Sequence, residues 1–291
     1  MNRLLDTMAV TAVRTFSRLP RSFALRFGRW FGATAHRIGG RKNPRIRTNL
    51  ERAGVVDPVR TTGTAWRHMG QTMFEMFWML DRSPDEALDG VQVHGMDQIR
   101  NAVTKGKGVL LVTAHAANWD LMSMALAREE IAPVAVIARN LRTPGLEKMQ
   151  IECRERAGIR TLVRGEAGAG ITAYRWLTKG GVLGVMMDRL SAGRRISVPF
   201  LGNATRMPLG PPELACRSGA AVVLGLSERT ESGGTVVRYR ELETAGISSA
   251  VEMAKTIAIA LDRELHTRPE QWFWIYRRQT AWNGEYTLTD K

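Results

Sequence analysis

The sequence predicts an α/β fold, a single domain whose central, mostly parallel sheet is covered by helices and preceded by a basic amphipathic helical N-terminus. Two observations carry this prediction. Short runs that are apolar at every position alternate with helical segments, which is typical of parallel strands buried on both faces. The N-terminal stretch is instead basic and places aromatic residues at helical spacing. We therefore expect residues 1–55 to be the helical segment and residues 56–291 to be the α/β domain.

The individual elements follow from these patterns. Apolar runs predict buried strands at residues 109–113, 134–138, 182–187 and 221–226. Helical periodicity predicts helices at about 64–80, 118–129, 145–157, 168–178, 211–218 and 249–266. We find no internal repeat and no Pro/Ser-rich linker that would divide the body of the chain further.

Composition excludes several classes of protein. Of the 291 residues, 44% are hydrophobic and 24% are charged, which is ordinary globular usage and argues against general disorder or low complexity. The two cysteines, Cys153 and Cys216, have neither CxxC spacing nor a nearby pair of histidines. A disulfide framework and a structural zinc site are therefore not expected, and a reducing compartment is the natural interpretation.

The positive charge is concentrated at the N-terminus. Residues 1–52 contain twelve Arg or Lys and two acids, so ten of the fourteen excess positive charges of the chain lie there. A helix is predicted from Pro20, which suits a first turn, to Gly39-Gly40. Four large rings share one face of this helix: Phe23, Phe27, Trp30 and Phe31. Arg21 and Arg29 point away from this face, and Arg26 lies beside it.

This aromatic face has two interpretations. It packs into the core, or it lies on an anionic membrane, where each nearby basic residue contributes about 1 kcal/mol to the free energy of binding. The charge bias favours the membrane. No apolar run of about 18 residues is present, and the first 19 residues lack the order of a signal peptide, being interrupted by Arg14 and Arg18. We therefore expect the protein to lie on a membrane and not to span it.

One segment has the character of an active site. The predicted strand at 109–113 is followed directly by Ala114-His115-Ala-Ala-Asn118-Trp-Asp120. A His just beyond the carboxyl end of a strand occupies the usual ligand crevice of an open α/β sheet. Asn118 is expected to cap the next helix and to place Asp120 in its first turn. From there Asp120 would reach back to the imidazole and orient His115 as a general base.

A His–Asp pair without a nucleophile favours direct transfer of a group to a bound alcohol over a covalent enzyme intermediate. G-x-S-x-G is absent, and both cysteines fall in predicted helices, so no serine or cysteine nucleophile accompanies the His–Asp pair. A structural role for His115 is the alternative, because H-x4-D spacing often arises by chance.

Two further acids are notable. Asp188 ends a buried strand and needs a partner such as Arg189 or His115. Glu75 is a lone acid in an apolar helical stretch, either site-adjacent or plain core.

H-x4-D after a strand resembles the signature of glycerolipid-type acyltransferases, and other segments resemble one branch, the late (lauroyl/myristoyl) acyltransferases of lipid A biosynthesis, related to phosphatidylinositol mannoside acyltransferases. The similarity runs from about residue 15 to 280. It rests on Arg45-Ile-Arg-Thr-Asn-Leu50, Ala138-Arg139-Asn140 with the following arginines, Asp188-Arg189, Ser197-Val-Pro-Phe-Leu-Gly202, Ala204-Thr-Arg-Met-Pro-Leu-Gly210, and Arg268-Pro-Glu-Gln-Trp-Phe-Trp274-Ile-Tyr276-Arg-Arg278. Leu190 and Tyr276 depart from this pattern, where family members often have an acid and a His.

The resemblance implies an enzyme that moves a fatty acyl group from a thioester donor, acyl carrier protein or CoA, to a hydroxyl of a membrane glycolipid such as a lipid A precursor. His115, Asp120 and Asp188 would be catalytic, without a covalent intermediate, metal or tightly bound cofactor. The substrate-binding residues would be Asn118 and four arginines, namely Arg139, Arg154, Arg164 and Arg189. Arginine suits the recognition of a phosphate group. The expected location is the cytoplasmic face of the inner membrane, peripheral or monotopic.

Two alternatives remain open at this point. The same chemistry would serve a lysophospholipid or another lipid acceptor. A basic protein that binds anionic lipid or nucleic acid without chemistry is the second alternative. The clustering of charge beside an aromatic face, and the lack of RNP, helix-turn-helix or zinc signatures, favour a membrane partner and no nucleic acid.

Overall fold

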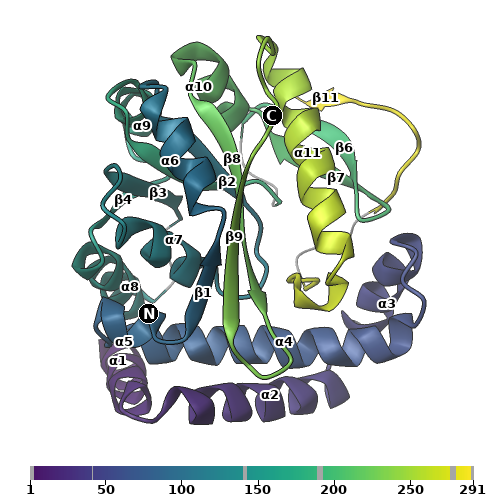
Figure 1. Cartoon of the computed structure of the whole chain (residues 1–291). Coiled ribbons are helices and arrows are strands. Elements are labelled where there is room, and N and C mark those ends of the chain that lie inside the picture. Colours follow the sequence, from purple (N-terminus) through teal and green to yellow (C-terminus); the bar gives the residue numbers. More distant parts are fainter. Residues whose placement is uncertain (1–2, 41, 140–142, 189–192, 276–279, 290–291) are drawn as a thin grey trace.

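A seven-stranded sheet runs through the centre of the computed structural model, which describes residues 3–40, 42–139, 143–188, 193–275 and 280–289 (Figure 1). Its strand order is β1-β9-β8-β2-β5-β3-β4, and every neighbouring pair is parallel except β8 and β9. The predicted mostly parallel sheet is therefore confirmed. The strands are β1 Val91–His94, β2 Val109–Thr113, β3 Val134–Ala138, β4 Ile159–Val163, β5 Val182–Met186, β8 Ala221–Arg229 and β9 Thr235–Glu241.

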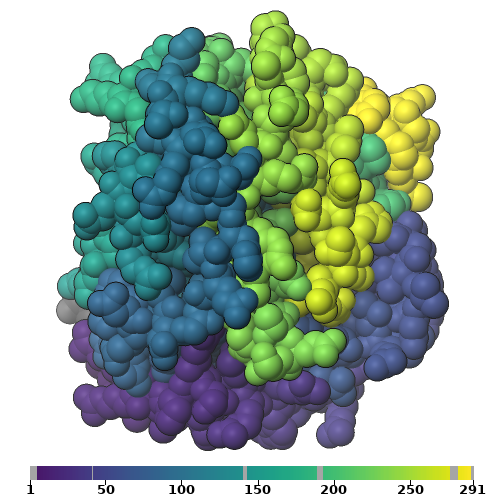
Figure 2. Space-filling view, viewed as in Figure 1, coloured from purple at the N-terminus to yellow at the C-terminus, as the bar shows by residue number. Residues whose placement is uncertain are grey.

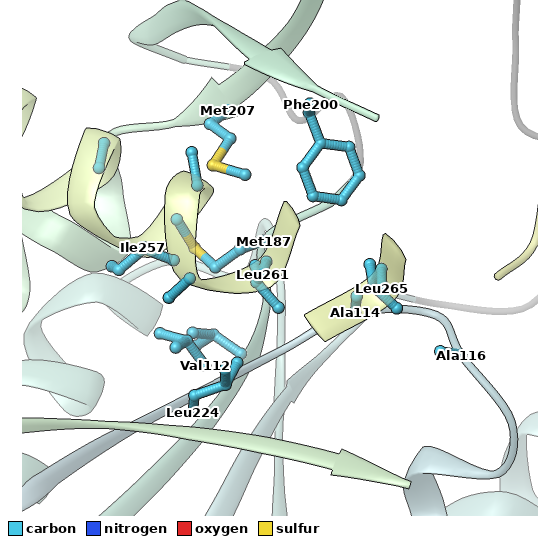
Figure 3. Packing of buried hydrophobic residues seen from close by; sticks show 14 of the residues in the cluster. Val112, Ala114, Ala116, Met187, Phe200, Met207, Leu224, Ile257, Leu261 and Leu265 are labelled. Carbon is cyan, nitrogen blue, oxygen red and sulfur yellow. The ribbon is translucent and has the colours of Figure 1, made fainter. Parts of the chain in front are cut away.

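Helices cover both faces of this sheet and form two apolar cores. One core lies under α5 (Pro84–Leu88), α6 (Met96–Thr104), α7 (Trp119–Ala127) and α8 (Pro144–Arg156). The other lies under α9 (Ala169–Thr178), α10 (Gly210–Ser218) and α11 (Ala250–His266). Figure 3 shows α11 presenting Ile257, Leu261 and Leu265 toward Val112 and Leu224 of the sheet.

A second, antiparallel sheet packs beside α11. Its order is β10-β7-β6-β11, with β6 Arg195–Phe200, β7 Asn203–Pro208, β10 Thr280–Ala281 and β11 Leu288–Thr289. Phe200 and Met207 lie on its buried side, within the same core as α11 (Figure 3). The sequence did not predict this sheet, because β6 alternates buried and half-buried residues and so lacks a continuous apolar run.

Four helices of the described chain come before α5 and the first strand and are called the N-terminal layer: α1 (Arg3–Ser17), α2 (Arg21–Arg37), α3 (Lys42–Arg52) and α4 (Pro58–Met79). In Figure 1, α2 lies along α4 at the base of the molecule. Glycines allow this close approach, since a Cβ on Gly28 would lie 2.6 Å from the carbonyl oxygen of Gly70, and one on Gly32 would lie 2.1 Å from that of Trp66. The predicted boundary at residue 55 falls in the turn between α3 and α4 and stays a prediction.

The aromatic face of α2 (Phe23, Phe27, Trp30 and Phe31) does not enter the core. The helix buries Ala24, Gly28 and Gly32 against α4, while Phe23, Trp30 and Phe31 are 39%, 60% and 40% exposed. The rings contact one another and Phe74 of α4, at ring-centre distances of 4.8–6.0 Å. Figure 2 shows this N-terminal layer as the underside of the molecule. Within the described part of the chain, no helix combines the length and hydropathy needed to cross a membrane.

Candidate active site

His115 and Asp188 follow two neighbouring parallel strands. β2 and β5 are paired so that Thr113 lies opposite Met186, and both strands end at the same edge of the sheet. His115 comes two residues after the end of β2, and Asp188 two residues after the end of β5. The topology therefore brings together two side chains that are 73 residues apart in the sequence.

The carboxylate of Asp188 holds His115 by both its backbone and its ring. Oδ1 lies 2.8 Å from Nδ1 of the imidazole, and Oδ2 accepts a hydrogen bond from the backbone N–H of His115 at 2.8 Å. The indole N–H of Trp272 donates to Oδ2 at 2.7 Å. Burial raises the pKa of Asp188, but the charge of His115 and these hydrogen bonds outweigh it, so that the pKa lies below its ordinary value. Asp188 is therefore an anion at neutral pH.

A distant segment fixes the loop that carries His115. The backbone N–H of Phe273 donates to the carbonyl oxygen of His115 at 3.0 Å, and that of Ala117 donates to the carbonyl oxygen of Gln271 at 3.2 Å. Ala117 has a φ of 43°, a left-handed conformation that L-residues other than glycine seldom adopt. Trp119 packs edge-on against the imidazole, with ring centres 4.8 Å apart. The position of His115 is thus determined on several sides.

Asp120 does not occupy the position that we expected. Asn118 caps α7 as predicted, and Asp120 lies in the first turn. Its carboxylate is bound by Arg154, with Nε at 2.9 Å, and by the side-chain amide of Gln150 at 3.3 Å, both from α8. The sequence predicts that Asp120 contacts an imidazole nitrogen of His115, but the carboxylate at Nδ1 is that of Asp188. The reason is geometric, because the first turn of α7 directs Asp120 toward α8.

Glu75 connects this site to the N-terminal helices. It is fully buried in α4 and forms ion pairs with Arg229, at the end of β8, and Arg21 of α2, at 2.5 Å and 2.7 Å. The side-chain amide of Asn118 donates to it at 3.1 Å. Burial raises the pKa of Glu75, but the two guanidinium groups prevail and lower it to about 2. Arg21 therefore points into the protein. This differs from the prediction, which counts Arg21 among the charges that lie beside a membrane.

A cavity of about 1320 Å³ opens at the edge of the sheet that carries His115. Its lining includes His115, Trp119 and Asp120. Most of the remaining lining comes from β3, β5, α9 and α10, and much of it is apolar.

Cys153 is buried in α8 with its thiol against the carbonyl oxygen of Met79, and burial raises its pKa to about 11. It therefore stays a neutral thiol.

The predicted arginines fall into three groups. Arg139 and Arg164 are exposed and line the cavity, and burial together with the nearby charge of Arg139 lowers the pKa of Arg164. Arg154 also lines the cavity, but it is committed to Asp120. Arg189 lies outside the described residues. Asn118 is completely buried, and its side chain is engaged by Glu75 and the helix cap, which places it beneath the site.

Sequence reasoning missed three residues around the site. Trp272, the third donor to Asp188, lies in the closing segment that carries part of the family resemblance, but nothing local indicates its partner 84 residues away. Arg194 and Arg217 add charge to the cavity lining. They resemble ordinary surface arginines in sequence. Only the tertiary structure brings them to the cavity, where Arg217 lies on α10 and Arg194 forms an ion pair with Glu213 of the same helix at 2.6 Å.

Comparisons with known proteins relate the whole chain to bacterial acyltransferases. The family model described as bacterial lipid A biosynthesis acyltransferase matches residues 2–280. A phosphatidylinositol mannoside acyltransferase of Mycolicibacterium smegmatis is 27% identical over 252 residues, which cover 83% of this chain and 81% of that protein. A phosphatidylinositol mannoside acyltransferase of Mycobacterium tuberculosis is 30% identical over 191 residues, covering 61% of this chain and 58% of that protein.

Proposed function

Because the chain belongs to the bacterial lipid A biosynthesis acyltransferase family and is an acyltransferase, we propose that it transfers a fatty acyl group from a thioester, on acyl carrier protein or CoA, to a hydroxyl of a membrane glycolipid. The observation that carries this proposal is the buried pair of His115 and Asp188 beside a large, partly apolar cavity. A lipid A precursor is the acceptor that we favour.

The chemistry follows from the orientation of the ring. With Asp188 on Nδ1, the imidazole is set to accept a proton at Nε2, and the anion stabilises the imidazolium that forms. The acceptor hydroxyl loses its proton to His115 while its oxygen attacks the thioester carbonyl. The C–S bond then breaks, and the departing thiolate takes the proton from the imidazolium. The thioester supplies the activation, so the step as written uses no metal or bound cofactor and no covalent enzyme intermediate.

Charge around the cavity suits the polar parts of both substrates. Arg139 and Arg164 stand close together at the rim, where two guanidinium groups would bind a phosphate of the donor or of the acceptor. Arg154 and Asp120 neutralise each other and are buried. We therefore assign phosphate binding to the rim, and to the Asp120–Arg154 pair the task of holding the wall of the cavity that α7 and α8 form.

The N-terminal layer supports a membrane partner. The aromatic face of α2 is exposed, and the contacts of Glu75 place the carboxyl edge of the sheet directly over α4, with α2 on the outer side. Aromatic rings flanked by arginines suit an anionic interface. We infer that this surface lies on the cytoplasmic face of the inner membrane, as a peripheral or monotopic attachment, and brings the site to its lipid acceptor.

The proposal is tested by incubating the purified protein with acyl-CoA or acyl-acyl carrier protein and vesicles that contain a lipid A precursor. A parallel set contains a mannosylated phosphatidylinositol. Mass spectrometry should detect an acceptor one acyl group heavier, and the product should depend on His115. A His115→Ala variant that keeps its fold and still acylates the lipid at the wild-type rate would refute the mechanism.

A further inference from the structure

The cavity reaches both faces of the central sheet. Val136 and Ile137 are consecutive residues of β3, and Gly184 and Val185 are consecutive residues of β5, yet all four line it. Consecutive strand residues point to opposite faces. The cavity therefore has an inner branch toward α7 and α8, lined by Thr113, Met122, Ser123, Val136, Gly184 and Met186. Its outer branch, toward α9 and α10, is lined by Ile137, Leu162, Ala173, Tyr174, Val185 and Leu214.

The two branches differ in their exposure to solvent. In the inner branch, Thr113, Met122 and Ser123 are buried, with 4%, 1% and 5% of their surface exposed, and Val136 and Met186 are half-buried. The outer branch is bordered by Ile171 and Tyr174 of α9, which are 60% and 38% exposed. A hydrocarbon chain is stabilised by each methylene that is removed from water, so the more buried branch suits it better. The inner branch also lies next to His115, because its lining residue Thr113 comes two residues before His115, which lines the same cavity.

The inner branch has a defined floor. Val136 and Gly184 lie opposite each other in the sheet, and among the described residues the lining of β3 and β5 extends no further toward the start of either strand. Asp188, which holds His115, comes four residues after Gly184. At about 3.3 Å per residue, the floor lies roughly 13 Å from the His–Asp pair along the strands.

Gly184 leaves this floor open. A Cβ built on it would lie 3.1 Å from Cγ1 of Val136, 3.6 Å from the carbonyl oxygen of Ala135 and 3.9 Å from Cβ of Val136. These three nearest atoms all belong to β3, and no atom of α7 would lie closer to this Cβ than 3.9 Å, so the tight contact is with Val136 and not with α7. Gly225 in β8 is different, because its Cβ would meet Sδ of Met122 at 2.8 Å and Cδ1 of Leu111 at 2.9 Å. Glycine inside a strand weakens it and often marks the close approach of a ligand.

We propose that Gly184 sets the length of the acyl chain that the enzyme accepts, with the chain extended along the inner branch and its terminal methyl against Gly184 and Val136. This inference rests on the proposed acyl transfer and adds to it the residue that determines donor specificity. A side chain at position 184 would raise the floor and exclude the last methylenes of the longest chain.

The test uses a series of saturated acyl thioesters that differ by two carbons, with wild-type protein, Gly184→Ala and Gly184→Val. The measured quantity is the ratio of kcat/KM for the longest good donor to that for a donor two methylenes shorter. Partial loss of folded protein cancels in this ratio. We expect Gly184→Val to lower it about tenfold or more, since one methylene in an apolar pocket is worth at least that much. Gly184→Ala should lower it less and keeps the test valid if the valine variant does not fold.

Ala173→Val is the matched control, because Ala173 is a fully buried residue of the outer branch. It should leave the chain-length preference unchanged. An unchanged preference in folded Gly184 variants that still transfer acyl groups would overturn this inference alone. A shift caused by Ala173→Val in place of Gly184→Val would assign the chain to the outer branch and overturn it as well. Absence of transfer by the wild-type protein with every donor would overturn the proposed function, and this inference with it.

Discussion

Asp188 touches His115 twice, with one carboxylate oxygen 2.8 Å from Nδ1 of the ring and the other 2.8 Å from the backbone nitrogen. A single anion therefore fixes both the loop and the tautomer of the histidine. Trp272 donates to the same carboxylate, so three N–H groups converge on two oxygens. Carboxylates that accept several hydrogen bonds remain ionised, which agrees with the lowered pKa of Asp188.

Asp188→Asn should lower kcat about 10²–10⁴-fold with a smaller effect on KM. Asparagine has one acceptor oxygen, so its NH₂ group would face either Nδ1 or the two donors at Oδ2, and the charge that stabilises the imidazolium is lost. Turnover and melting temperature should be measured together. Near-wild-type turnover in this variant would reduce Asp188 to a loop-forming residue.

Asp120→Asn should act mainly on stability. It leaves the buried charge of Arg154 without its partner, and breaking a buried ion pair in this way costs about 3–5 kcal/mol. Replacing Arg154 by Met in the same chain should recover much of that loss in a chemical denaturation experiment. Where both single variants are folded, turnover should fall less for Asp120→Asn than for Asp188→Asn. The reverse order would return the orienting role to Asp120.

Glu75 should make the protein sensitive to acid. Its pKa is about 2 in the folded protein, against 4.5 for the unperturbed group, so its contribution to stability is present above pH 4.5. That contribution is lost as the pH falls toward 2, and a difference of this size is worth about 3 kcal/mol. Glu75→Gln should be destabilised at neutral pH and should lose less stability than wild type between pH 4.5 and 2. Parallel curves of unfolding free energy against pH would contradict this assignment.

His68 should add a second acid-sensitive range. Burial, followed by the charges of Arg229, Arg29 and Arg268, lowers its pKa from 6.5 to about 4. Between these values the unfolded chain binds a proton that the folded protein does not, so the free energy of unfolding should fall as the pH decreases from 6.5 to 4. His68→Gln should flatten the curve of unfolding free energy against pH in this range and leave its slope above pH 7 unchanged. The measurement is thermal unfolding in a pH series at constant ionic strength.

The exposed face of α2 should control binding to membranes. Replacing Phe23, Trp30 and Phe31 by Ser should weaken sedimentation with anionic vesicles, and reversing Arg26 and Arg29 to Glu should do the same with an effect that diminishes at high salt. Activity on a water-soluble acceptor analogue should change little.

Arg21→Glu provides the contrast for this experiment, because it places a second acid beside buried Glu75 and should lower the melting temperature. Unchanged vesicle binding by the folded aromatic variant would show that the membrane contact lies elsewhere on the protein.

Several features of this protein were determined by the sequence alone. The strands at 109–113 and 134–138 were predicted with their observed bounds, because five consecutive apolar or small residues suit burial on both faces of a parallel sheet. The placement of His115 and Asp188 at carboxyl ends of strands followed from the same pattern. β6, β7 and β9 escaped prediction because polar and charged residues interrupt their apolar positions.

Only the tertiary structure decided which acid meets His115. Asp120 is five residues away along the chain and Asp188 is 73, and local spacing favours the nearer one. Pairing of β2 with β5 brings the distant carboxylate to the ring, while the first turn of α7 directs the near one to Arg154. The inward position of Arg21 has the same origin, since its partner lies on α4, which packs against α2 through glycines. Local patterns fix the ends of strands and the faces of helices, whereas the partners of buried charges depend on which elements become neighbours.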